Sequence, residues 1–304
     1  MLTRFAELEQ WLPKQTPATV AVAWAQDAHT LEAVLRAARE GLLRYRLVGK
    51  PQEILEIGET LGYGINEADI TAAETEEAAA RLAVELVRSG EADFLQKGKL
   101  PTATLLRQVV NKETGIGRGR LMSHLALLEL PGYSKLLGVT DGGMVPHPNL
   151  EEKKVILENA LELFWRLGYD RPLAAALCGA ETVSPKLPET VDAAALKEAA
   201  LTGDFGPCIV EGPISFDLAT DPNSARIKGF NSPVAGQADL LLTPDLAVGN
   251  LMVKGLTGFA GAKMVGIVLG ARCPIALNSR SADPMEKYNA LLLCACLAGG
   301  RKEA

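Results

Sequence analysis

Short apolar runs alternate with amphipathic stretches along almost the whole chain. The run Thr19–Trp24 has the length and composition of a buried strand. Apolar residues then recur at helical spacing between Leu31 and Ala38, so a helix is expected to follow that strand. The stretch Glu76–Arg88 is predicted to be a strong helix, because its small apolar residues gather on one face and Gly90 closes it.

The same alternation continues to the end of the chain. Buried strands are predicted at Thr19–Trp24, Arg44–Gly49, Asp93–Gln96, Lys135–Thr140, Leu173–Cys178, Cys208–Glu211, Ala238–Thr243, Met264–Leu269 and Ile275–Asn278. Helices are predicted at Glu76–Arg88, Leu150–Leu167, Thr190–Ala200, Ala247–Phe259 and Met285–Ala298. Strands and helices in steady alternation imply mainly parallel sheets covered by helices, which is an α/β fold.

Chain length points to more than one domain. A chain of 304 residues is long for one hydrophobic core. Two glycines and two prolines in Gly142–Asn149 mark the strongest break, and a second crossing is expected near Asn278–Asp283. We therefore predict a first domain of residues 1–143 together with 281–304, and a second domain of residues 144–280.

Composition narrows the class of protein. With 48% hydrophobic and 22% charged residues, the chain is not of the disordered type. No apolar run approaches the roughly 20 residues that cross a bilayer, and the polar N-terminus is unlike a secretory signal, so we expect a cytoplasmic protein that does not bind membranes. Five scattered cysteines are expected to be buried, reduced thiols, and three histidines without ligand-like spacing predict no metal site.

Charge is unevenly distributed. A net charge of −6 argues against a nucleic-acid partner, but the window Lys97–Arg120 holds six basic residues and one acid. This window fits a small polyanion, although a solvated basic face without a ligand is equally compatible with the charge alone. Its end, GIGRGR, can bring backbone amides and arginines close to phosphates, or it can form an ordinary glycine-rich turn.

Parallel α/β sheets bind ligands beyond the carboxyl ends of their strands. The segments predicted to lie there are Thr140–Gly143, Glu211–Pro213, Pro244–Asp245 and Asn278–Arg280. In the helix expected after Asp245, Asn250 and Lys254 lie one turn apart and share a face. Three glycines near its end are expected to be close-packing sites: Gly255, Gly258 and Gly261.

The last predicted strand ends in a hydroxyl and a guanidinium. Ser279 can donate a hydrogen bond to an oxyanion, and Arg280 offers a bidentate contact to phosphate. The amides of the following helix would add partial positive charge. Asp283 is well placed to cap that helix, with Pro284 as its first residue. The segment therefore favours an anion site over an ordinary surface turn.

Several segments, in order, resemble one known family. PVAGQADLLLTPDLAVGN at Pro233–Asn250 and FAGAKMVGIVLGARCPIALNSR at Phe259–Arg280 are similar to the C-terminal half of phosphate acetyl/butyryltransferases. GRLMSHLALLELPGY at Gly119–Tyr133 and VTDGGMVPHPNLEEKK at Val139–Lys154 are similar to the middle of that family, and DFLQKGKLPTATLLR at Asp93–Arg107 also fits. The residues of these segments, and the short length of the chain, are more similar to the phosphate butyryltransferase branch.

The resemblance carries expectations about fold, assembly and reaction. It implies two three-layer α/β domains with an interdomain cleft, the architecture of isocitrate and isopropylmalate dehydrogenases. It also implies a homodimer or higher homo-oligomer, no metal and no permanently bound cofactor, with coenzyme A as a substrate. The implied reaction converts acyl-CoA and phosphate to acyl phosphate and CoA by direct attack in a ternary complex, with a short, butyryl-type acyl group; phosphate acetyltransferase is the alternative.

The resemblance also assigns residues. Ser279 and Arg280 match the serine–arginine pair that the family uses for acyl and phosphate oxygens. The family's catalytic aspartate lies seven residues beyond that serine, where this chain has Glu286, and Asp283 is the nearby alternative base. The candidate contacts to CoA and phosphate are Lys97, Arg118, Arg120, Ser123, Asp141, Asn250 and Lys254.

Two other classes of protein stay open. A non-catalytic acyl-CoA-binding protein is one, because the base departs from aspartate. A metal-dependent decarboxylating dehydrogenase is the other, since it shares the two-domain layout, although the sequence shows neither its aspartate set nor a nucleotide loop. A cysteine nucleophile is disfavoured, because Cys273 lies before Pro274 in an apolar strand and Cys294 and Cys296 lie on a helix that is expected to be buried.

Overall fold

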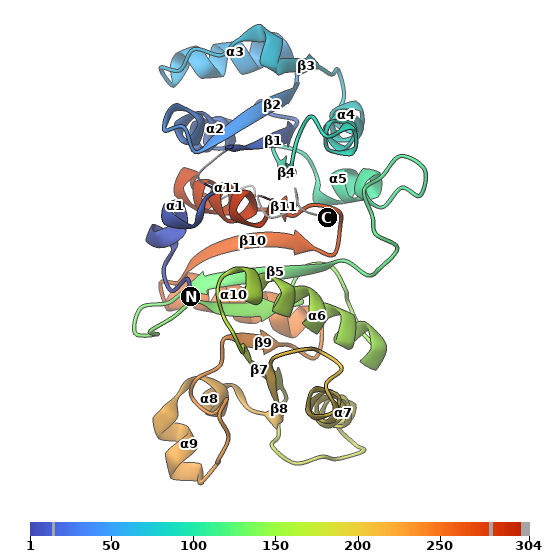
Figure 1. Ribbon diagram of the computed structural model, residues 1–304, viewed down its shortest axis with the longest axis vertical. Coiled ribbons are helices and arrows are strands. Elements are labelled where there is room, and N and C mark those ends of the chain that lie inside the picture. Colours follow the sequence, from blue (N-terminus) through green and yellow to red (C-terminus); the bar gives the residue numbers. More distant parts are fainter. Residues whose placement is uncertain (14–15, 280–281, 299–304) are drawn as a thin grey trace. The chain divides into compact units, whose positions relative to one another are not determined.

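Two units make up the computed structural model, which describes residues 1–13, 16–279 and 282–298 (Figure 1). Unit 1 comprises Met1–Arg4 and Leu121–Met264, and unit 2 comprises Phe5–Arg120 and Val265–Ala304. Both contain mainly parallel strands with helices on either face, so the predicted α/β class is confirmed. The expected domain boundaries after residues 143 and 280 stay a prediction, because the density of contacts does not show which segments fold on their own.

In unit 2 the strands follow the order β3-β2-β1-β4-β11-β10. Their bounds are β1 Ala18–Ala23, β2 Leu43–Gly49, β3 Ile70–Ala72, β4 Phe94–Lys97, β11 Ile275–Ala276 and β10 Lys263–Leu269, of which the residues from Val265 on belong to this unit. All neighbours are parallel except β10 and β11. The carboxyl ends of β1, β2, β4 and β11 therefore lie at one edge of the sheet.

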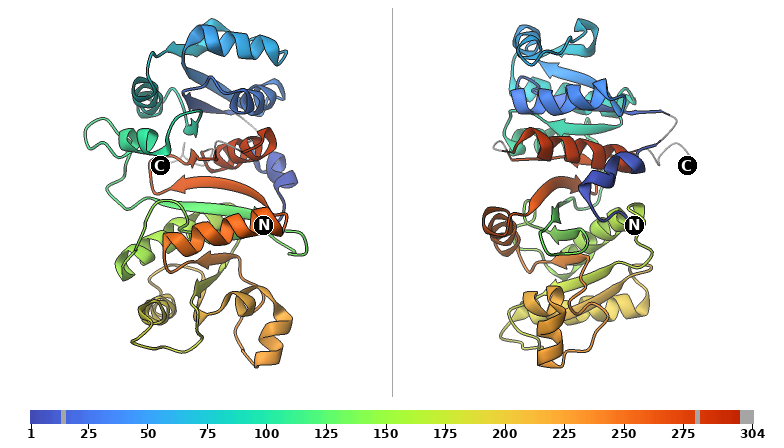
Figure 2. Two further views of the ribbon diagram at one scale, coloured as in Figure 1. Left: turned by 180° about the vertical axis from the view of Figure 1, so that it is seen from behind. Right: turned by 90° about the vertical axis from the view of Figure 1, so that its left-hand side faces the viewer.

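Helices cover both faces of that sheet. They are α1 Leu8–Trp11, α2 Ala28–Arg39, α3 Pro51–Thr60, α4 Glu76–Ser89, α5 Thr102–Val109 and α11 Pro284–Ala298. The helices α2 and α11 pack together on one face, and α4 and α5 on the other (Figures 1 and 2). Local chemistry sets their ends: Asp27 caps α2, Thr75 caps α4, and Gly90 ends α4 with a φ of 83°.

The strands of unit 1 follow the order β5-β6-β9-β7-β8. Their bounds are β5 Ser123–Glu129, β6 Leu137–Thr140, β7 Leu173–Leu177, β8 Ile209–Ile214 and β9 Leu240–Leu242. Only β5 and β6 pair antiparallel. The carboxyl ends of β6, β7, β8 and β9 therefore share one edge.

The helices of unit 1 are α6 Leu150–Arg166, α7 Pro188–Thr202, α8 Phe216–Thr220, α9 Pro222–Lys228 and α10 Leu246–Phe259. Figure 2 shows α6 and α10 on opposite faces of this sheet. Asn149 and Glu152 form a capping box that starts α6. On the α10 side, Val253 packs on a buried cluster that includes Val139 and Leu241 of neighbouring strands.

Every predicted strand and helix recurs with shifted ends, but several elements were missed. The apolar run Ser123–Glu129 was not predicted as a strand; short apolar runs do not distinguish a strand from a buried helix by period. The helices α3 and α5 were also missed, because α3 begins with Pro51 directly after a strand and α5 has only eight residues. Among the described residues, no helix combines the length and the apolar character that crossing a membrane requires.

Candidate functional site

The segment that follows β11 carries three of the predicted catalytic residues. Ser279 is exposed and comes directly after the buried Asn278, while Arg280 lies outside the described residues. The Ala282 amide donates to the Ser279 carbonyl at 3.2 Å. The Asn278 side-chain amide donates to the Glu286 carbonyl at 3.5 Å. Contacts within the segment thus join Ser279 to the start of α11.

Asp283 and Glu286, the two candidate bases, have different environments. Asp283 is exposed, and its Oδ1 atom accepts a hydrogen bond from the Glu286 amide at 2.8 Å, as a helix cap does. Glu286 is half-buried in the first turn of α11. Burial, and then the charge of Asp283, raises the pKa of Glu286, against the opposing effects of its hydrogen bond and of Lys287. A raised pKa suits a carboxylate for proton transfer near neutral pH.

Lys97 lies at the same edge of unit 2, at the end of β4. Its side chain is buried, and Nζ donates to the carbonyl oxygens of Gly98 and Leu100, both at 3.3 Å. Gly98 has no room for a side chain, since a Cβ there would lie 2.2 Å from the Trp24 carbonyl oxygen. Close backbone approach therefore brings the loops after β1 and β4 together.

The remaining predicted cations of unit 2 lie beyond α5. Arg118 is exposed and Arg120 is half-buried. The preceding loop is tied to the segment before β11, because the Arg272 amide donates to the Ile116 carbonyl at 2.9 Å and Gly117 forms a bridge with Ala271. The glycine-rich stretch is therefore anchored on one side and carries Arg118 at the surface.

In unit 1, Asp141 organises the loop after β6. One carboxylate oxygen accepts from the His124 amide at 2.9 Å, and the other accepts from the amides of Gly143 and Met144 at 2.6 and 2.8 Å. The side chain is buried. Three N–H donors therefore occupy this carboxylate, an arrangement that holds the backbone of the loop in one conformation.

This loop packs directly on the first turns of α10. A Cβ on Gly142 would lie 3.0 Å from the carbonyl carbon of Gly249, and a Cβ on Gly249 would lie 2.7 Å from the Asp141 carbonyl oxygen. Side chains cannot fit at either position without a shift of backbone. The Asn250 side-chain amide donates to the Gly142 carbonyl at 3.0 Å, whereas Lys254, one turn later, is exposed.

Sequence reasoning missed the neighbour of Ser123, His124. Its imidazole lies on Gly143, where a Cβ would be 2.8 Å from the His124 Cγ. The Nδ1 atom is shut off from water and has no hydrogen-bond partner among the described residues. Burial lowers the pKa of His124 against the opposing charge of Asp141, which favours a neutral ring. The spacing of His124 to other polar residues in the sequence did not indicate a functional role.

Ser123 itself is buried at the start of β5. Its hydroxyl accepts a hydrogen bond from the Asn159 side-chain amide at 3.0 Å, and the same amide group donates to the Leu121 carbonyl at 3.1 Å. Asn159 belongs to α6, so this contact ties the helix to the strand. Asn159 was not predicted, because a lone asparagine on a helix carries no motif.

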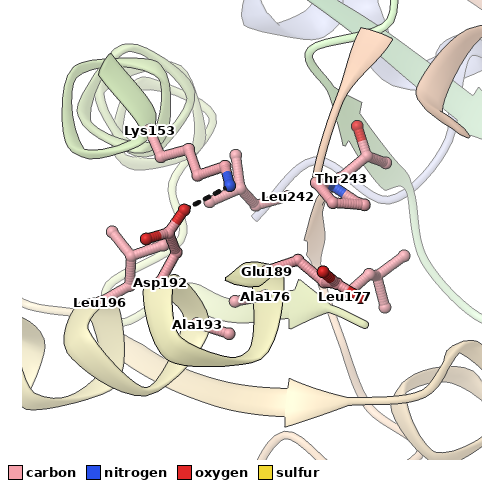
Figure 3. A pocket seen from close by; sticks show the side chains of 10 residues that line it. Lys153, Ala176, Leu177, Glu189, Asp192, Ala193, Leu196, Leu242 and Thr243 are labelled. Atoms are coloured by element: carbon pink, nitrogen blue, oxygen red, sulfur yellow. Dashed lines mark hydrogen bonds and ion pairs between the residues drawn. The ribbon is translucent and has the colours of Figure 1, made fainter. Parts of the chain in front are cut away.

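A hollow of about 190 Å³, open to solvent, lies at the carboxyl ends of β7 and β9 (Figure 3). Its floor is apolar, with Ala176 and Leu242 as paired neighbours on the two strands. At its side, Lys153 of α6 is buried and forms an ion pair with Asp192 of α7 at 2.7 Å. None of these residues was predicted as a site residue. Lys153 and Asp192 lie 39 positions apart in the sequence, so no local pattern relates them.

The cysteines have the environment of packed thiols. Burial, and then the charge of Glu189, raises the pKa of Cys178 to about 11, and burial raises that of Cys296 to about 12. Burial also raises the pKa of Cys294 well above its usual value. Thiols with such pKa values carry almost no thiolate at neutral pH. No three His, Cys, Asp or Glu side chains among the described residues are grouped closely enough to hold a metal ion.

The predicted site residues fall into two groups. In unit 1, Asp141 and Asn250 hold the loop after β6, whereas Ser123 contacts α6. In unit 2, Ser279 and Glu286 are joined through one short segment, and Lys97 ends a strand of the same sheet. The roles of these residues and the cleft between domains stay predictions.

Comparison with known proteins supports a common family. A sequence profile described as phosphate acetyl/butaryl transferase matches residues 67–295. The phosphate butyryltransferase of Clostridium acetobutylicum is 38% identical over 301 residues, which cover 99% of this chain and 100% of that protein. The phosphate acetyltransferase of Rhizobium meliloti is also 38% identical, over 290 residues that cover 95% and 92% of the two chains.

A solved structure agrees with these relatives. The branched-chain phosphotransacylase from Enterococcus faecalis superimposes with a TM-score of 0.80 at 31% identity, over 92% of this chain and 99% of that one. The sequence similarity to the profile and to the full-length relatives is higher than a shared fold alone would give. It confirms the resemblance first seen in the sequence segments. The chain belongs to the phosphate acetyl/butaryl transferase family.

Proposed function

We propose that this protein is an enzyme that transfers a short acyl group between coenzyme A and inorganic phosphate. The observation that carries the proposal is similarity along almost the entire chain to proteins named phosphate butyryltransferase and phosphate acetyltransferase. Acyl-CoA and phosphate would give acyl phosphate and CoA, and no permanently bound cofactor takes part. A cytoplasmic location, where these substrates occur, belongs to the same proposal.

The butyryl-type reaction is the preferred version. The relative from Clostridium acetobutylicum covers the chain slightly further than the acetyl-type relative does, at the same identity. The match to a branched-chain phosphotransacylase supports an acyl group larger than acetyl. Phosphate acetyltransferase is the alternative, and the two differ only in the size of the acyl group that the site accepts.

The chemical step needs a base and an oxyanion site. In the direction of CoA acylation, Glu286 takes the proton of the CoA thiol, whose pKa of about 8.5 leaves little thiolate at neutral pH. The thiolate attacks the acyl-phosphate carbonyl, and phosphate leaves. Ser279 and Arg280 stabilise the oxyanion and the departing phosphate. The half-buried position and raised pKa of Glu286 support its role, whereas the carboxylate of Asp283 is engaged as a helix cap.

The proposed substrate contacts differ in what they can offer. The exposed side chains Arg118 and Lys254 are available to CoA phosphates, and Lys97 and Arg120 add positive charge. In contrast, Ser123, Asp141 and Asn250 already make hydrogen bonds within unit 1. Asp141 and Asn250 hold the loop after β6, whose backbone then meets the substrate, and Ser123 ties α6 to β5.

A homodimer is also part of the proposal, and α10 is the surface that supports it. Leu251 is 70% exposed and Phe259 is 98% exposed, at helical spacing. A Cβ on Gly255 or Gly258 would meet no atom within 4 Å. The expectation that these glycines are close-packing sites is therefore wrong within one chain. A second copy that packs α10 against α10 would fill this space and cover the apolar side chains.

A direct assay tests the reaction. Butyryl-CoA and phosphate, without added metal or nicotinamide, are expected to yield butyryl phosphate, trapped as the hydroxamate, together with free CoA. Replacement of Arg280 by alanine should lower the rate at least about tenfold, because a charge-assisted contact contributes roughly 1.5–3 kcal/mol. Tight CoA binding without turnover would favour an acyl-CoA-binding protein, and metal-dependent nicotinamide reduction would favour a dehydrogenase.

A further inference from the structure

The first turn of α2 reaches the segment that carries Ser279. The Nδ1 atom of His29 lies 3.1 Å from the carbonyl oxygen of Ala282. A carbonyl oxygen only accepts, so Nδ1 carries the proton and donates it. Ala282 is buried and donates its own amide to the Ser279 carbonyl at 3.2 Å. His29, an exposed residue, thereby contacts a residue that is itself hydrogen-bonded to Ser279.

A second contact joins the same turn of α2 to the start of α11. Lys287 is only 3% exposed, and its Nζ atom donates to Asp27 Oδ2 at 2.8 Å and to Thr30 Oγ1 at 2.9 Å. Asp27 also accepts the Thr30 amide at 3.0 Å, as the cap of α2. A buried cation with these two oxygens is fixed in one position, because the loss of either partner would leave a desolvated charge.

These two contacts act on the two ends of one short segment. His29 binds it at Ala282, whose amide donates to the Ser279 carbonyl, and Lys287 follows Glu286 directly in α11. Within the segment, Asp283 caps the helix and the Asn278 side chain donates to the Glu286 carbonyl. Both contacts come from one helical turn that itself carries neither candidate catalytic side chain.

We propose that the first turn of α2 is a positioning clamp for Ser279 and Glu286, an inference that rests on the acyl transfer proposed above. His29 holds the loop through the Ala282 carbonyl, and Asp27 holds α11 through Lys287. Neither residue contacts substrate. Because a group misplaced by about 1 Å can lose much of its catalytic effect, loss of the clamp lowers kcat more than it changes substrate binding.

His29 gives the cleanest test, because the residue is exposed and its replacement should not unfold the protein. In the full-length enzyme, His29→Ala is expected to lower kcat about fivefold, the equivalent of one hydrogen bond, with KM for butyryl-CoA and phosphate within about twofold of wild type. His29→Asn should restore most of kcat, because the asparagine amide can donate where Nδ1 does. Glu32→Ala, on the next turn of α2, is the matched control and should leave kcat unchanged.

Asp27→Asn tests the second contact. Asparagine can still cap α2, but it removes the charge opposite Lys287, so kcat should fall at least about tenfold. Unfolding curves recorded in parallel identify a temperature at which every variant is folded, and the rates are compared there.

The results separate the two proposals. A wild-type enzyme that forms no acyl phosphate refutes the acyl transfer. An active wild type with unchanged kcat in both His29→Ala and Asp27→Asn refutes the clamp alone. The clamp is also refuted if His29→Ala raises KM for CoA at constant kcat, which would make His29 a substrate contact, or if His29→Asn behaves like His29→Ala.

Discussion

Asp283 and Glu286 are joined by a single hydrogen bond, in which the Glu286 amide donates to the Asp283 carboxylate at 2.8 Å. The bond makes Asp283 the cap of α11 and leaves the Glu286 side chain as the half-buried carboxylate of that turn. Asp283 also repels negative charge on Glu286, and together with burial it raises the pKa of Glu286. One carboxylate therefore shapes the helix start and tunes the other.

The different roles of Asp283 and Glu286 predict that neutralising each carboxylate affects kcat to a different extent. Glu286→Gln should lower kcat by at least about a hundredfold, since a general base contributes roughly 10²–10⁴. Asp283→Asn should retain most of the rate, because asparagine also caps helices. Initial rates of butyryl phosphate formation decide between them. A larger loss in Asp283→Asn than in Glu286→Gln would assign the base to Asp283.

The same pair predicts a pH effect. The base must be ionised, so kcat/KM falls as pH falls through the pKa of Glu286. Because that pKa is raised above the usual 4.5, the acid limb should lie at higher pH than an ordinary glutamate gives. Asp283→Asn removes the repulsion and should move the limb to lower pH. Profiles from about pH 4 to 8 measure this, and Asp69→Asn, which removes a surface ion-pair partner of Arg46, should leave the limb in place.

The Asp141 side chain should contribute more to the free energy of unfolding than an ordinary helix cap does. Asp141→Ala leaves the amides of His124, Gly143 and Met144 without their acceptor, and is expected to cost about 3 kcal/mol or more in the free energy of unfolding. Asp245→Ala, which removes the cap of α10, should cost about 1 kcal/mol. Urea unfolding compares the two. Equal losses would mean that Asp141 does not hold its loop.

The partly buried pair Lys153–Asp192 predicts coupling between α6 and α7. Lys153→Met leaves Asp192 without its partner and should destabilise the protein by about 3 kcal/mol, whereas the double variant with Asp192→Leu should recover most of that loss. The neighbouring surface pair offers a control: Lys154→Met breaks the exposed contact with Glu151 and should cost less than about 1 kcal/mol. Additive losses in the double variant would show that the two charges are uncoupled.

The exposed face of α10 predicts the oligomeric state. Wild type should have the mass of a dimer in light scattering, and Phe259→Glu should halve it, because a charge in an apolar contact is not compensated. Ile227→Glu places the same change on α9, where the isoleucine is 70% exposed, and should leave the dimer intact. A monomeric wild type, or a Phe259→Glu variant that stays dimeric, would exclude this interface.

Local patterns accounted for most of the elements. The helix Glu76–Ser89 follows from a capping threonine, a stripe of small apolar residues and a terminal glycine, all within 16 residues. The alternation of such helices with apolar strands was enough to predict an α/β fold. Ser279 could be singled out because it follows a strand and precedes a helix, the place where parallel sheets bind ligands, whereas Glu286 and Asp283 were assigned as candidate bases by the resemblance to the family.

Other features depend on contacts between distant parts of the chain. His29 and Ala282 are 253 positions apart, and Lys287 and Asp27 are 260 positions apart, so no local pattern relates them. The sequence by itself determined most of the elements, because periodicity and capping act over a few residues. Only the tertiary structure decided which loops share an edge of each sheet, because this depends on strand order. It also decided which polar side chains form hydrogen bonds that hold those loops, because these bonds depend on close backbone approach.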